Sequence, residues 1–280
     1  MQKFADYIKR IEIKSLWNGH KHIIWQLQPG VNVLSGKNGA GKSTIINRVA
    51  QHLLALPSTG EFRRSELPQG SLFGVQIDFS PSDATTIRYD LVRSVDRQLL
   101  HSDRISTLDD GKVTTELDWQ LYQLQRRYLD YQVNVGNRMI QLLTSGDPTA
   151  REKAAEAAGM KTLFQDLVDD LFSETGKRID RQSNELRFFQ YDEVILPYLL
   201  SSGEKQMLII LLTVLTEDLQ PCVLLMDEPE VSLHFDWQKR LIDMIRQLNP
   251  NAQIILTTHS PAVIMDGWSD CVTDVEDIVS

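Results

Sequence analysis

The sequence predicts an α/β fold with a mixed sheet core, an antiparallel β subdomain and a helical insertion, and three observations support this. Short apolar runs at 31–34, 221–226 and 254–256 each end in polar residues, which is typical of parallel strands that are covered on both faces. Strand-like segments separated by turn residues fill much of the first 95 residues. From residue 119 to 143 the apolar residues instead recur every three or four positions, which indicates a helix.

Three segments follow from these patterns in a chain of 280 residues, which is long enough to bury a substantial core. Residues 1–94 are predicted to form an N-terminal lobe, 95–190 a β-hairpin and helical insertion lobe, and 191–280 a C-terminal lobe. In the N-terminal lobe we expect strands at 7–13, 22–27 and 31–34, a helix at 42–54, and antiparallel strands at 72–79 and 86–95.

The insertion lobe is predicted to contain a hairpin followed by two helices. Strands at 105–108 and 113–117 flank Asp109-Asp110-Gly111-Lys112, a tetrapeptide that favours a tight turn. The helices are expected at 119–143 and 150–173, with apolar stripes that pack against each other and the core rather than in an intermolecular coiled coil. In the C-terminal lobe we expect a strand at 187–190, a buried helix at 207–215 and an amphipathic helix at 237–248.

A glycine-rich loop between the apolar run at 31–34 and the helix at 42–54 fits the phosphate-binding pattern G-x-x-x-x-G-K-[ST]. Its glycines let backbone N–H groups approach phosphate oxygens, and the following helix adds positive partial charge at its N-terminus. A chance glycine-rich turn is the alternative, but the strand–loop–helix context favours a nucleotide site. The loop consists of Gly36, Lys37, Asn38, Gly39, Ala40, Gly41, Lys42, Ser43 and Thr44.

Three further motifs follow in the C-terminal lobe, and each has a simpler explanation when it is taken alone. Leu200-Ser201-Ser202-Gly203-Glu204-Lys205-Gln206 precedes the buried helix, where Ser202 and Gly203 could serve only as a cap. Asp227 and Glu228 follow an apolar run and could be an exposed strand end. His259 follows the next apolar run and could be a satisfied core histidine.

Together and in this order, the four motifs resemble those of the ABC-type ATPases. Asn38 gives the phosphate loop the form typical of that superfamily, and Leu200–Gln206 resembles its signature motif, with Ser202 and Glu204 in place of the commoner Gly and Gln. The run Asp227-Glu228-Pro229-Glu230-Val231-Ser232-Leu233-His234 is closer to the soluble branch of RecF-like, chromosome-structure (SMC-like) and overcoming-lysogenization-defect ATPases. That branch also includes many bacterial anti-phage defence ATPases.

The resemblance implies an ABC-type P-loop ATPase that uses ATP and Mg²⁺. Lys42 is expected to contact the β- and γ-phosphates, and Ser43 and Asp227 to hold Mg²⁺. Glu228 is expected to be the general base that activates water, and His259 to sense or stabilise the γ-phosphate.

The resemblance also implies a homodimer that closes around ATP. Ser201, Ser202, Gly203 and Glu204 are expected to lie against the ATP of the second subunit.

Two departures from the transporter members of the superfamily are visible. Ser232-Leu233-His234 stands where those cassettes usually carry Ser-Ala-Leu-Asp. The glutamine that reaches the metal in those proteins is not identified, with Gln76 and Gln123 as possibilities. Trp17 is a candidate for stacking on adenine, although a structural tryptophan is an equal alternative.

Charge and composition narrow the location and the partners. The net charge is −9, but residues 1–64 carry ten Lys/Arg against three Asp/Glu, whereas residues 227–280 carry three against ten. An acidic protein is a poor non-specific nucleic-acid binder. We therefore interpret the basic residues of 1–64 as nucleotide contacts and solvated surface rather than as a nucleic-acid patch.

The chain shows neither an apolar run that could span a bilayer nor a signal peptide, so a cytoplasmic protein without a membrane partner is expected. Cys222 and Cys271 are interpreted as reduced core residues, with a disulfide as the open alternative.

The favoured function is a soluble ATPase subunit that controls a separate effector, such as a nuclease, or a nucleic-acid partner in bacterial anti-phage defence. A RecF-like DNA-repair or DNA-clamping ATPase is one alternative. The cytoplasmic ATPase subunit of an ABC transporter is another, although Ser232-Leu233-His234 and the long insertion argue against it. If the helical lobe docks the effector, Arg126 and Arg127 are predicted to be exposed positions on it.

Overall fold

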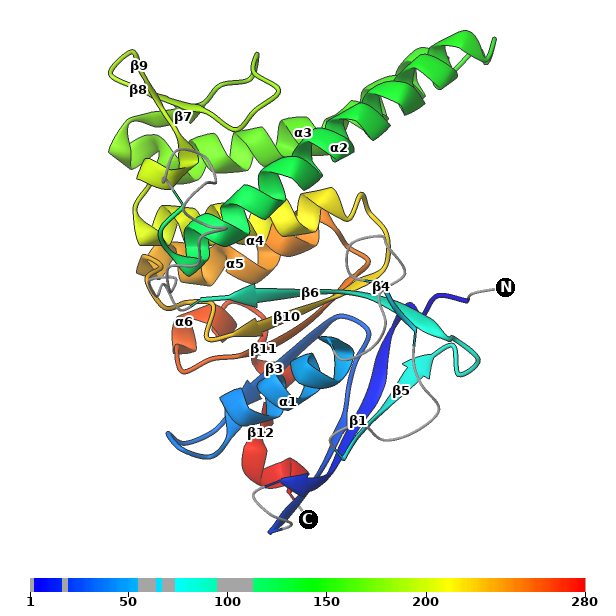
Figure 1. The fold of residues 1–280 in the computed structure, drawn as a ribbon, viewed down its shortest axis with the longest axis vertical. Helices are drawn as coiled ribbons and strands as arrows, with labels where there is room; N and C mark the ends of the chain where they lie inside the picture. The colour runs from blue at the N-terminus through cyan, green and yellow to red at the C-terminus, as the bar shows by residue number, and fades with distance from the viewer. Residues whose placement is uncertain (1–2, 17–19, 55–63, 67–73, 95–112, 280) are drawn as a thin grey trace.

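The computed structural model describes residues 3–16, 20–54, 64–66, 74–94 and 113–279, and it confirms the predicted α/β fold. Figure 1 shows a layered arrangement in which a main sheet carries α2 to α5 on one side and α1 on the other. A second, antiparallel sheet lies beyond α1. Two clusters of buried side chains fill the spaces between these layers, one on each side of the main sheet.

The main sheet has the strand order β12-β3-β11-β10-β6-β4 and is parallel except at β4. Strands from the predicted N-terminal and C-terminal lobes therefore share one sheet. β10 is continuously apolar because Val223 and Leu225 face the cluster around α1, whereas Leu224 and Met226 face the cluster around α4. The six strands are β3 (Val31–Ser35), β4 (Arg64–Glu66), β6 (Thr86–Arg93), β10 (Cys222–Asp227), β11 (Ala252–Thr257) and β12 (Val272–Asp274).

The antiparallel sheet has the order β2-β1-β5, with β1 at Tyr7–Leu16, β2 at Lys21–Gln26 and β5 at Val75–Ser80. The prediction that the strands at 72–79 and 86–95 pair with each other is wrong. β5 pairs with β1, whereas β6 pairs with β10 in the main sheet. The physical reason is burial, since β6 buries adjacent residues on both of its faces and so requires cover on both sides.

The helices match the predicted positions closely. The main ones are α1 (Lys42–Leu54), α2 (Glu116–Thr144), α3 (Ala150–Phe172), α4 (Ser202–Thr216) and α5 (Phe235–Leu248). The shorter ones are α6 (Pro261–Ile264), η2 (Ser173–Thr175), η3 (Pro197–Leu199), η4 (Ser269–Cys271) and η5 (Val275–Ile278). A small sheet β7-β8-β9 completes the fold, with strands Lys177–Ile179, Phe188–Gln190 and Glu193–Ile195.

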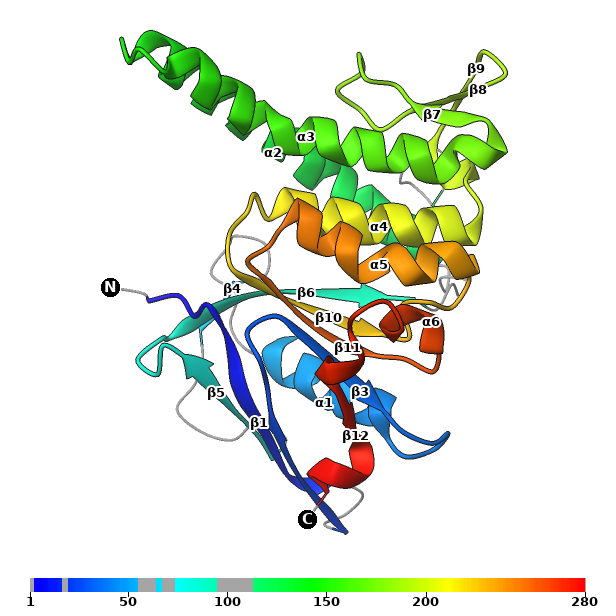
Figure 2. The same cartoon turned by 180° about the vertical axis from the view of Figure 1, so that it is seen from behind.

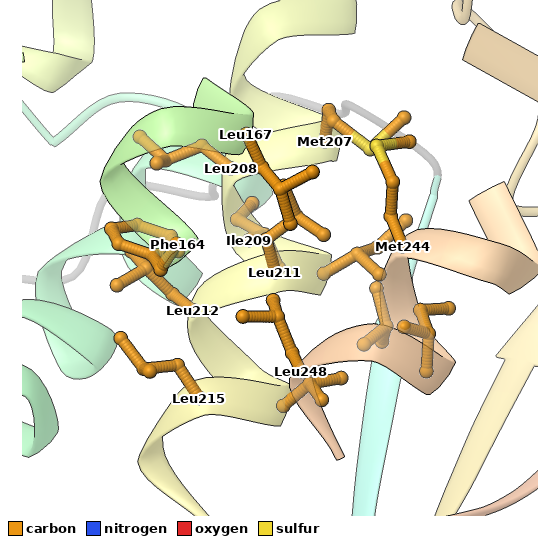
Figure 3. Packing of buried hydrophobic residues seen from close by; sticks show 14 of the residues in the cluster. Phe164, Leu167, Met207, Leu208, Ile209, Leu211, Leu212, Leu215, Met244 and Leu248 are labelled. Carbon is orange, nitrogen blue, oxygen red and sulfur yellow. The ribbon is translucent and has the colours of Figure 1, made fainter. Parts of the chain in front are cut away.

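The buried helix α4 is the centre of the larger cluster. Figure 3 shows Phe164 and Leu167 of α3 on one side of it and Met244 and Leu248 of α5 on another. α2 also packs on α3 and α4, which confirms that the stripes of the two long helices pack internally. Figure 2 shows the far end of the α2–α3 hairpin extending beyond the layer of α4 and α5.

The start of α2 differs from the prediction. Residues 105–112 of the expected hairpin lie outside the described residues, and 113–117 is not a strand, because α2 begins at Glu116. Thr115 and Asp118 form a capping box, in which the Thr115 hydroxyl accepts from the Asp118 N–H at 3.2 Å and Asp118 accepts from the Thr115 N–H at 3.1 Å. Asp118 also pairs with Lys205 of α4 at 2.8 Å, which fixes the helix start on the core.

A buried ionic cluster joins α2 to the main sheet and contradicts the prediction that Arg127 is exposed. The Arg127 guanidinium donates to Asp90 of β6 at 2.9 Å and to Glu217 after α4 at 2.5 Å. Only 12% of the Arg127 side chain and 1% of the Asp90 side chain are exposed. Burial and the nearby Asp90 charge raise the pKa of Glu217 to about 7. Arg126, by contrast, is exposed.

Both cysteines are free thiols. Cys222 is buried at the start of β10 as predicted, whereas Cys271 is only partly buried. Burial raises the pKa of both thiols. Within the described ranges, none of the helices combines the length and the apolar character needed to cross a membrane.

Candidate functional site

One cavity of about 900 Å³ collects half of the residues that the sequence predicted for nucleotide binding and hydrolysis. It lies where the loop between β3 and α1 meets the residues that follow β10 and β11. These strands are parallel neighbours, β3 beside β11 and β11 beside β10, so their carboxyl ends open on the same edge of the sheet. The lining residues are Asn38, Gly39, Gly41, Lys42, Ser43, Thr44, Glu228 and His259.

The phosphate loop has the backbone conformation that its glycines permit. Gly39 and Gly41 have φ angles of 80° and 103°, in the left-handed region that favours glycine. The Lys42 ammonium donates to the carbonyl oxygens of Gly36 at 2.8 Å and Lys37 at 3.1 Å, so the lysine folds back over its own loop. Because α1 begins at Lys42, the N–H groups of its first turn face the cavity end of the helix.

Three of the nine predicted loop residues shape the loop rather than line the cavity. A Cβ on Gly36 would lie 3.4 Å from Val275, so the loop packs closely against η5. Ala40 donates its N–H to the Lys37 carbonyl at 3.1 Å, and the exposed Lys37 ammonium pairs with Glu276 at 3.3 Å.

The side chains of Asp227 and Glu228, at the end of β10, point in different directions. Asp227 is the partner of Thr257 in the β10–β11 register, and its carboxylate accepts from the Thr257 hydroxyl at 2.6 Å. Glu228 has a φ of 46°, and its N–H donates to Thr257, which turns its side chain out of the strand direction and into the cavity. Sequence reasoning missed Thr257, although a threonine that ends an apolar strand beside an Asp-Glu pair was an available signal.

Glu228 and His259 meet in the cavity. Their side chains come from neighbouring strands, and His259 Nε2 lies 3.2 Å from Glu228 Oε1. Both side chains are partly exposed, with 39% of His259 and 34% of Glu228 accessible. The structure therefore brings together the two residues that the sequence proposed as base and γ-phosphate sensor.

The predicted magnesium ligands are hard oxygen donors, which fit Mg²⁺. Ser43 lines the main cavity, whereas Asp227 lines a different cavity of about 390 Å³ with Asn47 and Gln51 of α1. Across the residues that the structure describes, no group of three or more His, Cys, Asp or Glu side chains could hold a metal without other ligands.

The two candidate glutamines for the metal do not reach this site. Gln76 lies exposed on β5, and Gln123 of α2 lines a separate cavity of about 230 Å³ with Trp119. Trp17 lies outside the described residues.

The predicted signature residues stand at the start of α4 and do not line the main cavity. Ser201 and Glu204 form a capping box, in which the Ser201 hydroxyl accepts from the Glu204 N–H at 3.3 Å and the Ser201 N–H donates to the Glu204 carboxylate at 2.9 Å. Although burial opposes its ionisation, the ammonium of Lys177 at 2.9 Å and the Ser201 hydrogen bonds lower the pKa of Glu204. The Glu204 carboxylate is therefore engaged inside its own subunit, whereas Ser201 and Ser202 are exposed.

Gly203 is required by a close approach that the sequence did not reveal. A Cβ at Gly203 would lie only 2.4 Å from the carbonyl oxygen of Ser232, in the loop between β10 and α5. Ser232 itself has a φ of 79°. The start of α4 is thus seated directly on the loop that begins with Glu228.

Comparisons with known proteins agree with this geometry. A family model described as "AAA domain, putative AbiEii toxin, Type IV TA system" matches residues 63–266. A stretch of 42 residues is 45% identical to the Septu protein PtuA of Bacillus thuringiensis, and this match spans 15% of the chain and only 11% of that protein.

Solved structures show the same fold. The Smc head bound to the C-winged helix domain of ScpA superposes with a TM-score of 0.53 at 16% identity, over 93% of this chain and 92% of that one. The Smc head with an extended coiled coil, bound to the C-terminal domain of ScpA from Pyrococcus furiosus, gives 0.50 at 15% identity, over 93% and 91%. At such identities the likeness concerns the fold alone.

Proposed function

Because the chain belongs to the AAA-domain family described as putative AbiEii toxin, Type IV TA system, we propose that it is an ATP-hydrolysing subunit that acts in anti-phage defence. In this proposal, two copies close around ATP and control a separate effector. The proposal of ATP hydrolysis rests on one observation, namely that a single cavity is lined by Lys42, Ser43, Glu228 and His259.

The proposed reaction is ATP + H₂O → ADP + phosphate. Lys42 and the N–H groups at the start of α1 bind the β- and γ-phosphates. Glu228 accepts the proton of the attacking water, and His259, held at 3.2 Å, orients that carboxylate and lies beside the γ-phosphate. Ser43 and Asp227 would hold Mg²⁺, which neutralises charge on the phosphate oxygens.

The dimer is proposed from the position of the signature residues. Ser201 and Ser202 are exposed at the N-terminus of α4, a place that suits an anion, yet they stand outside the cavity of their own subunit. In a head-to-tail dimer, these two serines of each copy would lie against the nucleotide bound by the other copy. The dimer would then contain two equivalent sites. Because the Glu204 carboxylate is engaged internally, we assign the contact to Ser201, Ser202 and the backbone at Gly203.

The defence role and the separate effector rest on the short match to the Septu protein PtuA. A requirement for ATP fits the cytoplasmic location expected from the sequence.

Lys42→Ala is expected to abolish productive ATP binding. The variant loses the cation that would contact the β- and γ-phosphates, and charge-assisted contacts of this kind are among the strongest in a phosphate site. ATP affinity by calorimetry and phosphate release at saturating ATP are the measurements. Lys239→Ala in α5, which removes a lysine that is 31% exposed and lies outside the cavity, is the control and should match the wild type. Unchanged affinity and turnover in Lys42→Ala would place the nucleotide elsewhere.

Ser201→Arg is expected to stop hydrolysis while leaving ATP binding to the monomer intact, because the bulky cation would block the approach of the second nucleotide. Mixing it with Lys42→Ala places both defects in one site and neither in the other, so activity should return in part. Ser201→Ala is the matched control, since it also removes the α4 cap, worth about 1 kcal/mol, without adding bulk. If mixed dimers form and no activity returns, the two-site arrangement is wrong.

A further inference from the structure

A second glutamate, Glu230, stands two residues after the proposed base in the loop that joins β10 to α5. Only 7% of it is exposed, so its carboxylate faces the protein interior rather than the nucleotide cavity. Buried carboxylates are costly unless donors surround them, and the identity of those donors shows what Glu230 holds.

Among the described residues, the donors to Glu230 all come from the loop that carries His259. Glu230 Oε1 accepts the Thr258 hydroxyl at 2.5 Å, the His259 N–H at 2.8 Å and the Ser260 N–H at 3.3 Å. One carboxylate oxygen therefore fixes the backbone on both sides of the His259 side chain.

The contact between Glu228 and His259 joins two separate loops, and Glu230 ties these loops together beside that contact. A second tie runs parallel to it, because Ser260 donates its hydroxyl to Gln238 at 2.6 Å and Gln238 donates to the Leu233 carbonyl at 2.9 Å. These hydrogen bonds hold the two loops together on either side of the contact between His259 and Glu228.

The other oxygen of Glu230 has a different environment. Glu230 Oε2 is buried and has no hydrogen-bond partner among the described residues. A glutamine oxygen could accept the same three bonds, so what the carboxylate adds is negative charge next to the His259 backbone.

We propose that Glu230 is a positioning residue for ATP hydrolysis, which holds the Thr258–His259–Ser260 backbone so that His259 stays against Glu228. The inference rests on the proposed ATPase function. It assigns Glu230 no contact with ATP, so its loss should slow the reaction without weakening nucleotide binding.

The test compares wild type, Glu230→Ala and Glu230→Gln, with the exposed Glu193→Ala of β9 as the control for loss of a carboxylate. Phosphate release gives kcat, and calorimetry gives the ATP dissociation constant. Glu230→Ala should lower kcat at least tenfold with the dissociation constant within twofold. Glu230→Gln should recover part of the loss, because its amide oxygen still accepts from the His259 N–H, and Glu193→Ala should match the wild type.

A second measurement separates positioning from a general effect on the fold. If Glu230 acts through His259, then adding Glu230→Ala to His259→Ala should lower kcat by less than a further twofold. Independent, multiplying losses in the double variant would overturn the proposal, as would an unchanged kcat in Glu230→Ala. Should Glu230→Ala fail to fold, Glu230→Gln decides, with at least a threefold loss of kcat expected and no loss contradicting the idea. A wild type without ATPase activity would refute the proposed function instead.

Discussion

Glu228→Gln is expected to lower the ATPase turnover number by about 10²–10⁴-fold, the usual contribution of a general base. Glutamine keeps the size of the side chain, so the cavity and its Mg·ATP affinity should change little. The amide cannot accept the proton from water, and its contact with His259 loses the carboxylate charge. Because hydrolysis would no longer reset the complex, the variant should accumulate as the ATP-bound dimer.

Single-turnover phosphate release and size-exclusion chromatography with ATP test this expectation. Asp236→Asn is the matched control, since it removes a carboxylate that is 68% exposed at the start of α5. A Glu228→Gln turnover within about twofold of the wild type, less than 1 kcal/mol of barrier, would exclude Glu228 as the base.

Arg127→Ala is expected to lower the free energy of unfolding by about 3–5 kcal/mol, the usual cost of breaking a buried ion pair by removing one partner. The guanidinium is the shared partner of Asp90 and Glu217, and its loss leaves two buried carboxylates facing each other. Part of the cost should fall as Glu217 takes up a proton, because the pKa of this group already lies near 7.

The neighbouring Arg126→Ala provides a control of the same residue type on the same helix. Arg126 is exposed, so its replacement should change stability by no more than about 0.5 kcal/mol. Urea denaturation of both variants gives the comparison. Equal stability of the two would show that the cluster around Arg127 is energetically neutral, and only Arg126 remains suitable for testing effector docking on the helical lobe.

Much of the fold followed from local pattern. The helix at 42–54 was predicted with the bounds that α1 has, because a phosphate loop sets its start and its apolar face has clear helical spacing. The strands after which Asp227 and His259 lie were equally plain, since continuous apolar runs suit a parallel sheet covered on both faces.

The wrong predictions concern features that depend on contacts between segments far apart in the sequence. No feature of residues 86–95 themselves indicates that β6 pairs with β10 in the main sheet rather than with a strand of the antiparallel sheet. The sequence alone does not distinguish Arg127 from its neighbour Arg126. Arg127 is buried because Asp90 and Glu217, which belong to other segments, pack against it in the fold. The close approach of Gly203 to the Ser232 carbonyl likewise joins residues that come together only in three dimensions.

The interleaved order of the main sheet also bears on how the protein is made. β3, which leads into the phosphate loop, has β11 and β12 as its neighbours, and both are synthesised late in the chain. At roughly 5–20 residues per second, the ribosome needs on the order of ten to forty seconds to pass from β3 to β11. Throughout that interval the phosphate loop has no sheet to hold it, and this long-range pairing makes late, slow closure the natural course of folding. The sheet edge that positions the phosphate loop and His259 is therefore completed only after β11 has been added.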